Sequence, residues 1–167
     1  MQNNIVLIGF MGSGKSTVGK AVADRLNLPF YDLDLYIEKK QNMKITEIFE
    51  KFGEEHFRRL ETAAAAELSA KEKVVISCGG GTVLRKENTD ILKKNGRVFY
   101  LKIDAKTVIE RLKDDCSRPL LQRDDKEAAI NELLSKRSPI YEAVCDYKID
   151  ADSGVDSAVD RIIELSI

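Results

Sequence analysis

Residues 9–16 (GFMGSGKS) match the pattern G-x-x-x-x-G-K-[ST] of the phosphate-binding loop, and they follow a short apolar run over residues 5–8. Glycines let the backbone turn so tightly that successive N–H groups point at one phosphate, and the helix that follows adds the positive end of its dipole. Lys15 is then placed to reach the outer phosphates, and the Ser16 hydroxyl to bind the magnesium ion that they carry. The alternative is a flexible glycine turn. The strand-loop-helix context favours a site for a nucleoside triphosphate.

Two aspartates, Asp32 and Asp34, follow the predicted strand over residues 29–32. Magnesium in such sites usually needs a carboxylate at the end of a second strand, and the predicted strand over residues 74–78 ends without one. If the backbone stays extended, both aspartates point to the same side, so that one can hold the metal while the other faces an acceptor hydroxyl. Alternatively, Asp34 caps a helix over residues 35–40.

Three consecutive glycines, Gly79, Gly80 and Gly81, come directly after the strand over residues 74–78. They cost backbone entropy that a simple turn does not require, so we expect them where the backbone approaches a ligand closely and offers it N–H groups. A plain strand-to-helix turn is the alternative. The carboxyl end of a strand lies on the ligand-binding side of an open α/β sheet, which favours the first interpretation.

Arginines form the last candidate group, because their planar forks match a carboxylate or a phosphate. Arg58 and Arg59 lie on one predicted helix, Arg118 in a polar stretch that Pro119 breaks, and Arg137 late in the helix after that stretch. Any one of them could be a solvated surface residue. The proline that follows Arg118 in a lid-like loop distinguishes this arginine from the others.

These groups must be positioned by alternating strands and helices. We predict strands near residues 4–9, 29–32, 74–78, 97–102 and 146–150. We predict helices near residues 15–26, 34–40, 45–70, 88–95, 105–113, 125–144 and 155–166. This alternation implies a parallel sheet with helices on both faces, and the short aliphatic strands are typical of one. Asp104 and Ser153 are expected to cap the helices that begin after them.

The composition is that of one soluble globular domain over residues 1–167, with 43% hydrophobic and 33% charged residues. A net charge of -1 gives no basic footprint for nucleic acid and no attraction to an anionic membrane. No apolar run approaches the roughly 18 residues of a membrane span, and the chain begins directly with a strand, so we expect no signal peptide. Cys78, Cys116 and Cys145 are odd in number and lack C-x-x-C spacing, which indicates a reduced cytoplasmic setting and no zinc site.

Together these motifs resemble the shikimate kinases, from one end of the chain to the other. The residues that carry the resemblance are the loop 9–16 with Thr17 and Gly19, Asp32, Asp34, Phe57, Arg58, Glu61, Ser77, Gly79, Gly80, Gly81, the run 118–121 (RPLL), Arg137 and Tyr141. The resemblance implies the P-loop three-layer α/β fold of the nucleoside-monophosphate-kinase type, with a five-stranded parallel sheet of order 2-3-1-4-5. It further implies a substrate-binding segment near residues 33–61, a mobile lid near residues 113–125, and ATP-dependent phosphorylation of the 3-hydroxyl of shikimate, a step towards aromatic amino acids.

The resemblance also implies a role for each site residue. Asp34 would hold the hydroxyls of shikimate and help to remove the reacting proton, while Arg58 and Arg137 grip its carboxylate and the glycine triplet lines its other side. Lys15 and Arg118 would act on the transferred phosphate, and Ser16 and Asp32 would hold Mg²⁺. The residues expected at the nucleotide are Gly12, Ser13, Gly14, Lys15, Ser16, Thr17, Arg111, Arg118 and Asp152. Arg111 would pack on one face of the adenine, and the segment 150–154 would approach the other.

Three other functions share part of this pattern of residues. A kinase for another polyol acid such as gluconate would keep the arginine clamp, but Asp34 and the glycine triplet would not be expected together. A guanine-nucleotide switch would need an N-K-x-D motif, which this sequence lacks. A catalytically dead nucleotide-binding module is disfavoured because all the acidic and cationic positions are present. A monomer is the default, since nothing in the sequence indicates an interface.

Four further residue types do not enter the predicted catalytic set. His56, the only histidine, is expected on an exposed helix face. Phe49, Phe52 and Phe57 have the spacing of core residues, although the family resemblance also places Phe49 and Phe57 in the wall of the substrate pocket. Cys78 is expected to be small and buried. Ala65, where the family usually has a larger aliphatic residue, suggests a local change in helix packing.

Overall fold

The protein is described by a computed structural model that covers residues 3–115, 121 and 124–167. Its strands are β1 (Asn4–Ile8), β2 (Phe30–Asp32), β3 (Val75–Ser77), β4 (Gly96–Lys102) and β5 (Tyr147–Asp150). They form one parallel sheet of order β2-β3-β1-β4-β5, so the predicted fold and strand order are confirmed. Each strand lies within two residues of its predicted position.

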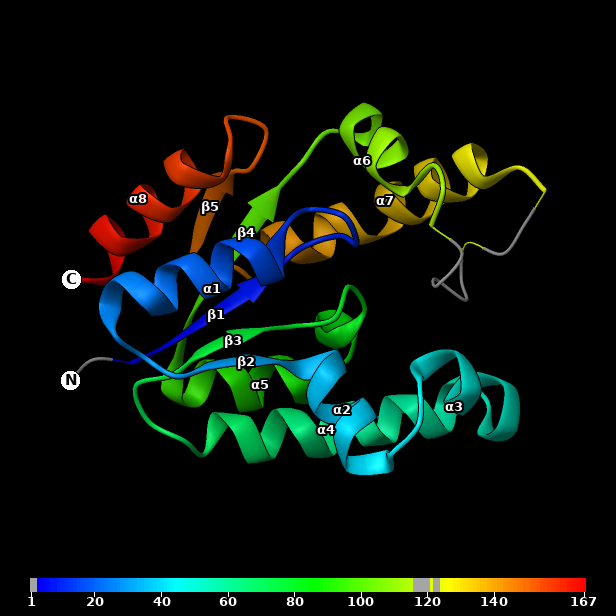
Figure 1. Cartoon of the computed structure of the whole chain (residues 1–167), viewed down its shortest axis with the longest axis horizontal. Coiled ribbons are helices and arrows are strands. Elements are labelled where there is room, and N and C mark those ends of the chain that lie inside the picture. Colours follow the sequence, from blue (N-terminus) through cyan, green and yellow to red (C-terminus); the bar gives the residue numbers. More distant parts are fainter. Residues whose placement is uncertain (1–2, 116–120, 122–123) are drawn as a thin grey trace.

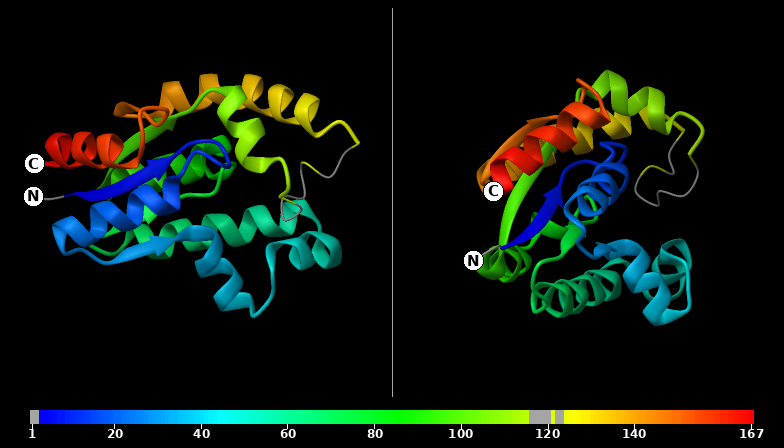
Figure 2. Two further views of the ribbon diagram at one scale, coloured as in Figure 1. Left: turned by 45° about the horizontal axis from the view of Figure 1, so that its top comes forward. Right: turned by 60° about the vertical axis from the view of Figure 1, so that its left-hand side comes forward.

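Helices cover both faces of this sheet (Figure 1). They are α1 (Lys15–Leu26), α2 (Leu33–Gln41), α3 (Ile45–Phe52), α4 (Glu54–Ser69), α5 (Lys86–Asn95), α6 (Ala105–Leu112), α7 (Lys126–Val144) and α8 (Val155–Ser166), with a short 3₁₀ turn, η1 (Thr82–Leu84). The helices α1 and α8 pack together on one face, and α4, α5 and α7 lie on the other. Figure 2 shows α2 and α3 projecting from the carboxyl edge of the sheet, on the same side as the loop between β1 and α1.

The core is made by aliphatic strands that are covered on both sides. Val6, Leu7 and Ile8 of β1 have no exposed surface, and Phe99 and Leu101 of β4 are equally buried. This buried platform fixes the carboxyl ends of the central strands, from which the loops of the site emerge. None of the helices in the described part of the chain is long and apolar enough to cross a membrane.

The predicted single helix over residues 45–70 is wrong, because Gly53 divides it into α3 and α4. Gly53 has φ 84 and ψ 170, a conformation that L-residues with a side chain rarely adopt. The apolar periodicity continues across this break, so the sequence pattern alone did not reveal it. The break places α3 beyond the end of α4, and α4 runs back under the sheet (Figure 1).

Replacing Gly53 with alanine should therefore destabilise the protein by about 1–2 kcal/mol through backbone strain alone. A Cβ at this position would meet no atom within 4 Å, so no steric clash contributes. Urea unfolding followed by circular dichroism measures the effect, with Lys51→Ala on the exposed surface of α3 as the control. An unchanged unfolding midpoint in Gly53→Ala would contradict the assignment of strain to this residue.

Two predicted helix caps are also wrong. Asp104 lies at the cap position of α6, but its side chain makes no capping hydrogen bond. The Asp152 carboxylate takes this place by accepting from the Asp104 N–H (3.1 Å) and from the Thr107 hydroxyl (3.0 Å). Gly154 rather than Ser153 precedes α8, and the Ser153 hydroxyl instead donates to the Asp150 carbonyl (3.2 Å). Local sequence could not reveal a cap supplied from 48 residues away.

Candidate active site

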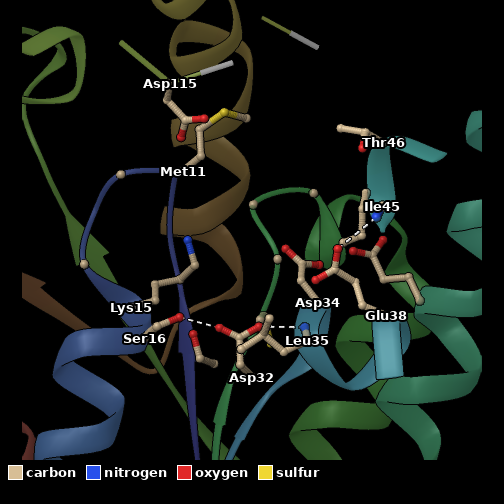
Figure 3. Close-up of a pocket in the computed structure, with 18 of the residues that line it drawn as sticks. Met11, Lys15, Ser16, Asp32, Asp34, Leu35, Glu38, Ile45, Thr46 and Asp115 are labelled. Carbon is tan, nitrogen blue, oxygen red and sulfur yellow. Dashed lines mark hydrogen bonds between the residues drawn. The ribbon is translucent and has the colours of Figure 1, made fainter. Parts of the chain in front are cut away.

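A cleft of about 1240 Å³ opens at the carboxyl edge of the sheet, where the loops after β1, β2 and β3 meet (Figure 3). Its lining contains most of the predicted site residues: Gly12, Gly14, Lys15, Ser16, Thr17, Asp32, Asp34, Arg58, Gly79, Gly80, Gly81, Arg111 and Arg137. Ser13 of the loop is buried, and Arg118 lies outside the described residues. Six separate segments of the chain are thus brought together at one site.

The phosphate-binding loop has the backbone that its glycines predict. Gly12 and Gly14 have φ 80 and 89, in the left-handed region. The Lys15 ammonium is 2.8 Å from the Gly9 carbonyl and 3.0 Å from the Phe10 carbonyl, to both of which it donates. Figure 3 shows this ammonium pointing into the cleft. The loop therefore places a cation beside the N-terminus of α1, the end of a helix that favours a phosphate group.

Arg111 brings the end of α6 against the same loop. Its guanidinium donates to the Gly12 carbonyl at 2.8 Å. Asp114 and Asp115, just beyond α6, and Val155 at the start of α8 also line the cleft. The Asp152 carboxylate is bound to the start of α6 instead, so its expected contact with the nucleotide remains a prediction.

The two aspartates after β2 have different settings. Asp32 accepts a hydrogen bond from the Ser16 hydroxyl and caps α2 by accepting from the Leu35 N–H at 3.1 Å. The backbone becomes helical at Leu33, so the condition of an extended D-x-D is not met, and the alternative that Asp34 is the cap is wrong. Asp34 lies in the first turn of α2 and faces Gly79 across the cleft. One aspartate is thereby joined to the phosphate-binding loop and the other to the glycine triplet.

Each glycine of the triplet faces a different functional side chain. An ideal Cβ on Gly79 would lie 2.8 Å from Asp34 Oδ1, and one on Gly80 would lie 3.2 Å from Arg137 Nη1. A Cβ on Gly81 would lie only 2.6 Å from Arg58 Nη1. The triplet thus provides the space into which these three side chains converge, which a plain turn would not require. This geometry agrees with the interpretation that the glycines are needed because other groups approach the backbone closely here.

Arg58 is held in place by two carboxylates of its own helix. It forms ion pairs with Glu61 (3.0 Å) and Glu54 (3.2 Å), and its side chain is 12% exposed. Glu61 is 1% exposed and also accepts from the Thr82 hydroxyl at 2.9 Å. Burial alone would lower the pKa of Arg58, but the charge and hydrogen bond of Glu61, helped by Glu54, hold that pKa above its ordinary value. Arg59, by contrast, is exposed.

Arg137 reaches the same place from α7. Its guanidinium carbon is 5.9 Å from the centre of the Phe10 ring, and only 4% of the residue is exposed. Its Nε has no hydrogen-bond partner among the described residues. A buried cation with spare donor capacity, beside a second arginine and a glycine triplet, is suited to bind a small carboxylate.

Sequence reasoning did not assign a role to Glu38, which lines the cleft four residues after Asp34. Its carboxylate accepts from the Ile45 N–H at 2.9 Å and so fixes the corner between α2 and α3 (Figure 3). Figure 3 shows Asp34 and Glu38 pointing into the same cleft, as the i, i+4 spacing on one helix could have indicated.

The predictions for the three phenylalanines have different outcomes. Phe49 and Phe57 line the cleft with their ring centres 5.1 Å apart, as expected from the family resemblance. Phe52 is 55% exposed, so its predicted place in the core is wrong. Its ring lies against the half-buried His56. Cys78 is buried as predicted, and burial raises the pKa of its thiol, which makes it unreactive.

These features define a class of protein: a P-loop kinase with a cationic pocket for a small acidic substrate next to its phosphate-binding loop. The family model of shikimate kinase matches residues 11–166. The shikimate kinase of Thermodesulfovibrio yellowstonii is 50% identical over 149 residues, which cover 89% of this chain and 86% of that protein. The shikimate kinase from Acinetobacter baumannii, solved in complex with shikimate, superposes with a TM-score of 0.92 at 38% identity, covering 99% of this chain and 91% of that one.

The chain therefore belongs to the shikimate kinase family. A gluconokinase from Sinorhizobium meliloti also superposes, covering 99% of this chain and 94% of that one, with a TM-score of 0.61 at 20% identity. That likeness shows a shared fold alone, so the gluconate alternative gains no support from it.

Proposed function

We propose that this protein transfers the γ-phosphoryl group of ATP to the 3-hydroxyl of shikimate, giving shikimate 3-phosphate and ADP. The observation that carries the proposal is the convergence of Asp34, Arg58 and Arg137 on the glycine triplet, opposite Lys15. Shikimate has one carboxylate and three hydroxyls, and this site offers it two cations, one buried and one largely buried, and a carboxylate acceptor. Membership of the family supports the same substrate.

In this mechanism the residues of the chain mainly position the reactants and stabilise charge. Arg58 and Arg137 bind the carboxylate of shikimate and so orient its ring. Asp34 accepts a hydrogen bond from the reacting hydroxyl and removes its proton as the oxygen attacks phosphorus. Lys15 leaves the carbonyls of the loop to neutralise the charge on the transferred phosphoryl group, assisted by Arg118.

We propose that Ser16 and Asp32 hold Mg²⁺ together with phosphate oxygens of ATP. Their two oxygens are already in contact beside the loop, and both are the hard ligands that Mg²⁺ prefers. Among the described residues no group of three acidic, histidine or cysteine side chains could hold a metal, in line with an ion that takes most ligands from phosphate and water. When bound, Mg²⁺ neutralises phosphate charge.

The nucleotide would lie over residues 12–17, with Arg111 against the adenine. The position of Arg111 on the loop supports this assignment, and Val155 offers an apolar surface on the α8 side of the cleft. The assignment of Asp152 and Arg118 to the nucleotide site rests on the family resemblance alone.

We further propose a single kinase domain with a lid near residues 113–125 that works as a cytoplasmic monomer and binds neither nucleic acid nor membrane. The net charge of -1 supports the absence of a polyanionic partner. Cys78 and Cys145 are free thiols, as expected in a reducing compartment.

The decisive experiment measures ADP release from Mg²⁺–ATP with shikimate and, separately, with gluconate as the acceptor. We expect turnover with shikimate, gluconate at background, and a product whose phosphorus resonance couples to the proton on carbon 3. Circular dichroism verifies folding. Folded protein that releases no ADP in response to shikimate would contradict the proposed function.

A further inference from the structure

Tyr141 is a buried residue at the edge of the site that the mechanism above does not use. It lies on α7 one turn after Arg137 and has no exposed surface. Its hydroxyl donates a hydrogen bond to the carbonyl oxygen of Gly80, the central residue of the glycine triplet. The two elements that share this bond are 61 residues apart in the sequence.

This bond fixes the orientation of a peptide that would otherwise rotate easily. Glycines lack the Cβ that restricts φ and ψ, so a run of three has little intrinsic preference for one orientation. The Gly80 carbonyl and the Gly81 N–H belong to one planar trans peptide and point in opposite directions. Anchoring the carbonyl on Tyr141 therefore directs the Gly81 N–H away from the interior of α7.

Tyr141 is itself rigidly held. Its ring packs against Tyr100 of β4 with ring centres 5.2 Å apart and an interplanar angle of 37°. Burial raises the pKa of Tyr141, so the phenol stays protonated and remains a donor. Such a donor cannot turn to solvent, because it is enclosed between the sheet and α7.

The same helix presents the arginine of the substrate pocket to the same glycine. Arg137 and Tyr141 are four residues apart, so they lie on one face of α7. Arg137 Nη1 would be 3.2 Å from a Cβ on Gly80, whose carbonyl Tyr141 binds. The Arg137 side chain also hydrogen-bonds to the Tyr141 phenol, so this phenol contacts both the arginine and the triplet and sets the spacing between them.

We propose that Tyr141 is a positioning residue for the acidic substrate, acting by locking the Gly80 peptide and its spacing from Arg137. The inference rests on the proposed function, because it concerns the binding of shikimate. It predicts that removal of this one hydroxyl weakens shikimate binding and leaves nucleotide binding intact.

The test compares Tyr141→Phe with Tyr100→Phe. We expect Tyr141→Phe to raise the KM for shikimate roughly tenfold, equivalent to about 1.4 kcal/mol, since a buried carbonyl loses its partner. The KM for ATP and kcat should stay within about twofold of wild type. Tyr100→Phe removes the other phenol of the same ring pair, which belongs to a buried residue but bonds with Ser138 rather than with the triplet, and it should leave all three constants unchanged.

Calorimetric titration of shikimate without nucleotide gives the same comparison as a dissociation constant, and thermal unfolding measures the stability lost by each variant. A loss of stability with an unchanged KM for shikimate would overturn the inference, as would equal rises in both KM values. Wild-type protein without shikimate turnover would instead contradict the proposed function. If the wild type turns over shikimate and Tyr141→Phe has a normal KM for shikimate, only the proposed role of Tyr141 is contradicted.

Discussion

Asp34→Asn should lower kcat with shikimate by about 10²- to 10⁴-fold, the range that a general base contributes, while ATP affinity stays close to wild type. The amide keeps the size of the side chain and can still hydrogen-bond to the substrate. It cannot take the proton from the attacking hydroxyl at neutral pH. Asp34 faces Gly79 rather than the phosphate-binding loop, so its loss should leave the nucleotide site intact.

Asp32→Asn is the matched comparison, because it makes the same change two residues earlier. Asp32 is bonded to Ser16 beside the loop, so this variant should weaken Mg²⁺–ATP binding. Single-turnover kinetics measures the rate of phosphoryl transfer, and calorimetric titration measures the affinity for Mg²⁺–ATP. Together they distinguish the two variants. If Asp34→Asn lost ATP affinity as far as it lost turnover, Asp34 would belong to the metal site and its proposed role would be wrong.

The parts of the fold that follow from local pattern could be predicted from the sequence. Five aliphatic strands and the helices between them are repeated signals, and right-handed crossovers leave few topologies for them. The phosphate-binding loop is a contiguous motif, so its structure also follows from residues 9–16 alone. The break at Gly53 does not, because one glycine inside a continuous apolar pattern is compatible with an unbroken helix.

Within the site, the sequence predicts which residues take part better than it predicts which of them contact one another. The sequence identifies Asp32 and Asp34 as a pair, yet which of them caps α2 depends on where the backbone becomes helical. Which side chain faces each glycine of the triplet depends on how α2, α4 and α7 pack on the sheet. Sequence spacing carries no information about such contacts between distant segments. The same holds for Tyr141 and for the cap that Asp152 supplies to α6.

Arg58→Met should raise the KM for shikimate about 100-fold, equivalent to about 2.7 kcal/mol, within the range found when one partner of a buried charge pair is removed. It should also destabilise the protein by about 3 kcal/mol, because Glu61, 1% exposed, is left as a buried charge without its cation. Steady-state kinetics and urea unfolding measure the two effects. Arg59→Ala, at the exposed neighbouring position, should change neither.

The double variant Arg58→Met/Glu61→Gln separates binding from stability. With both charges removed, most of the lost stability should return, since a neutral amide can still accept from the Thr82 hydroxyl. The KM for shikimate should stay high, because the cation that grips the substrate is still missing. Recovery of a normal KM along with stability would mean that Arg58 serves only to neutralise Glu61, leaving Arg137 as the cation that binds the carboxylate. A high KM in a stable double variant assigns Arg58 directly to the substrate.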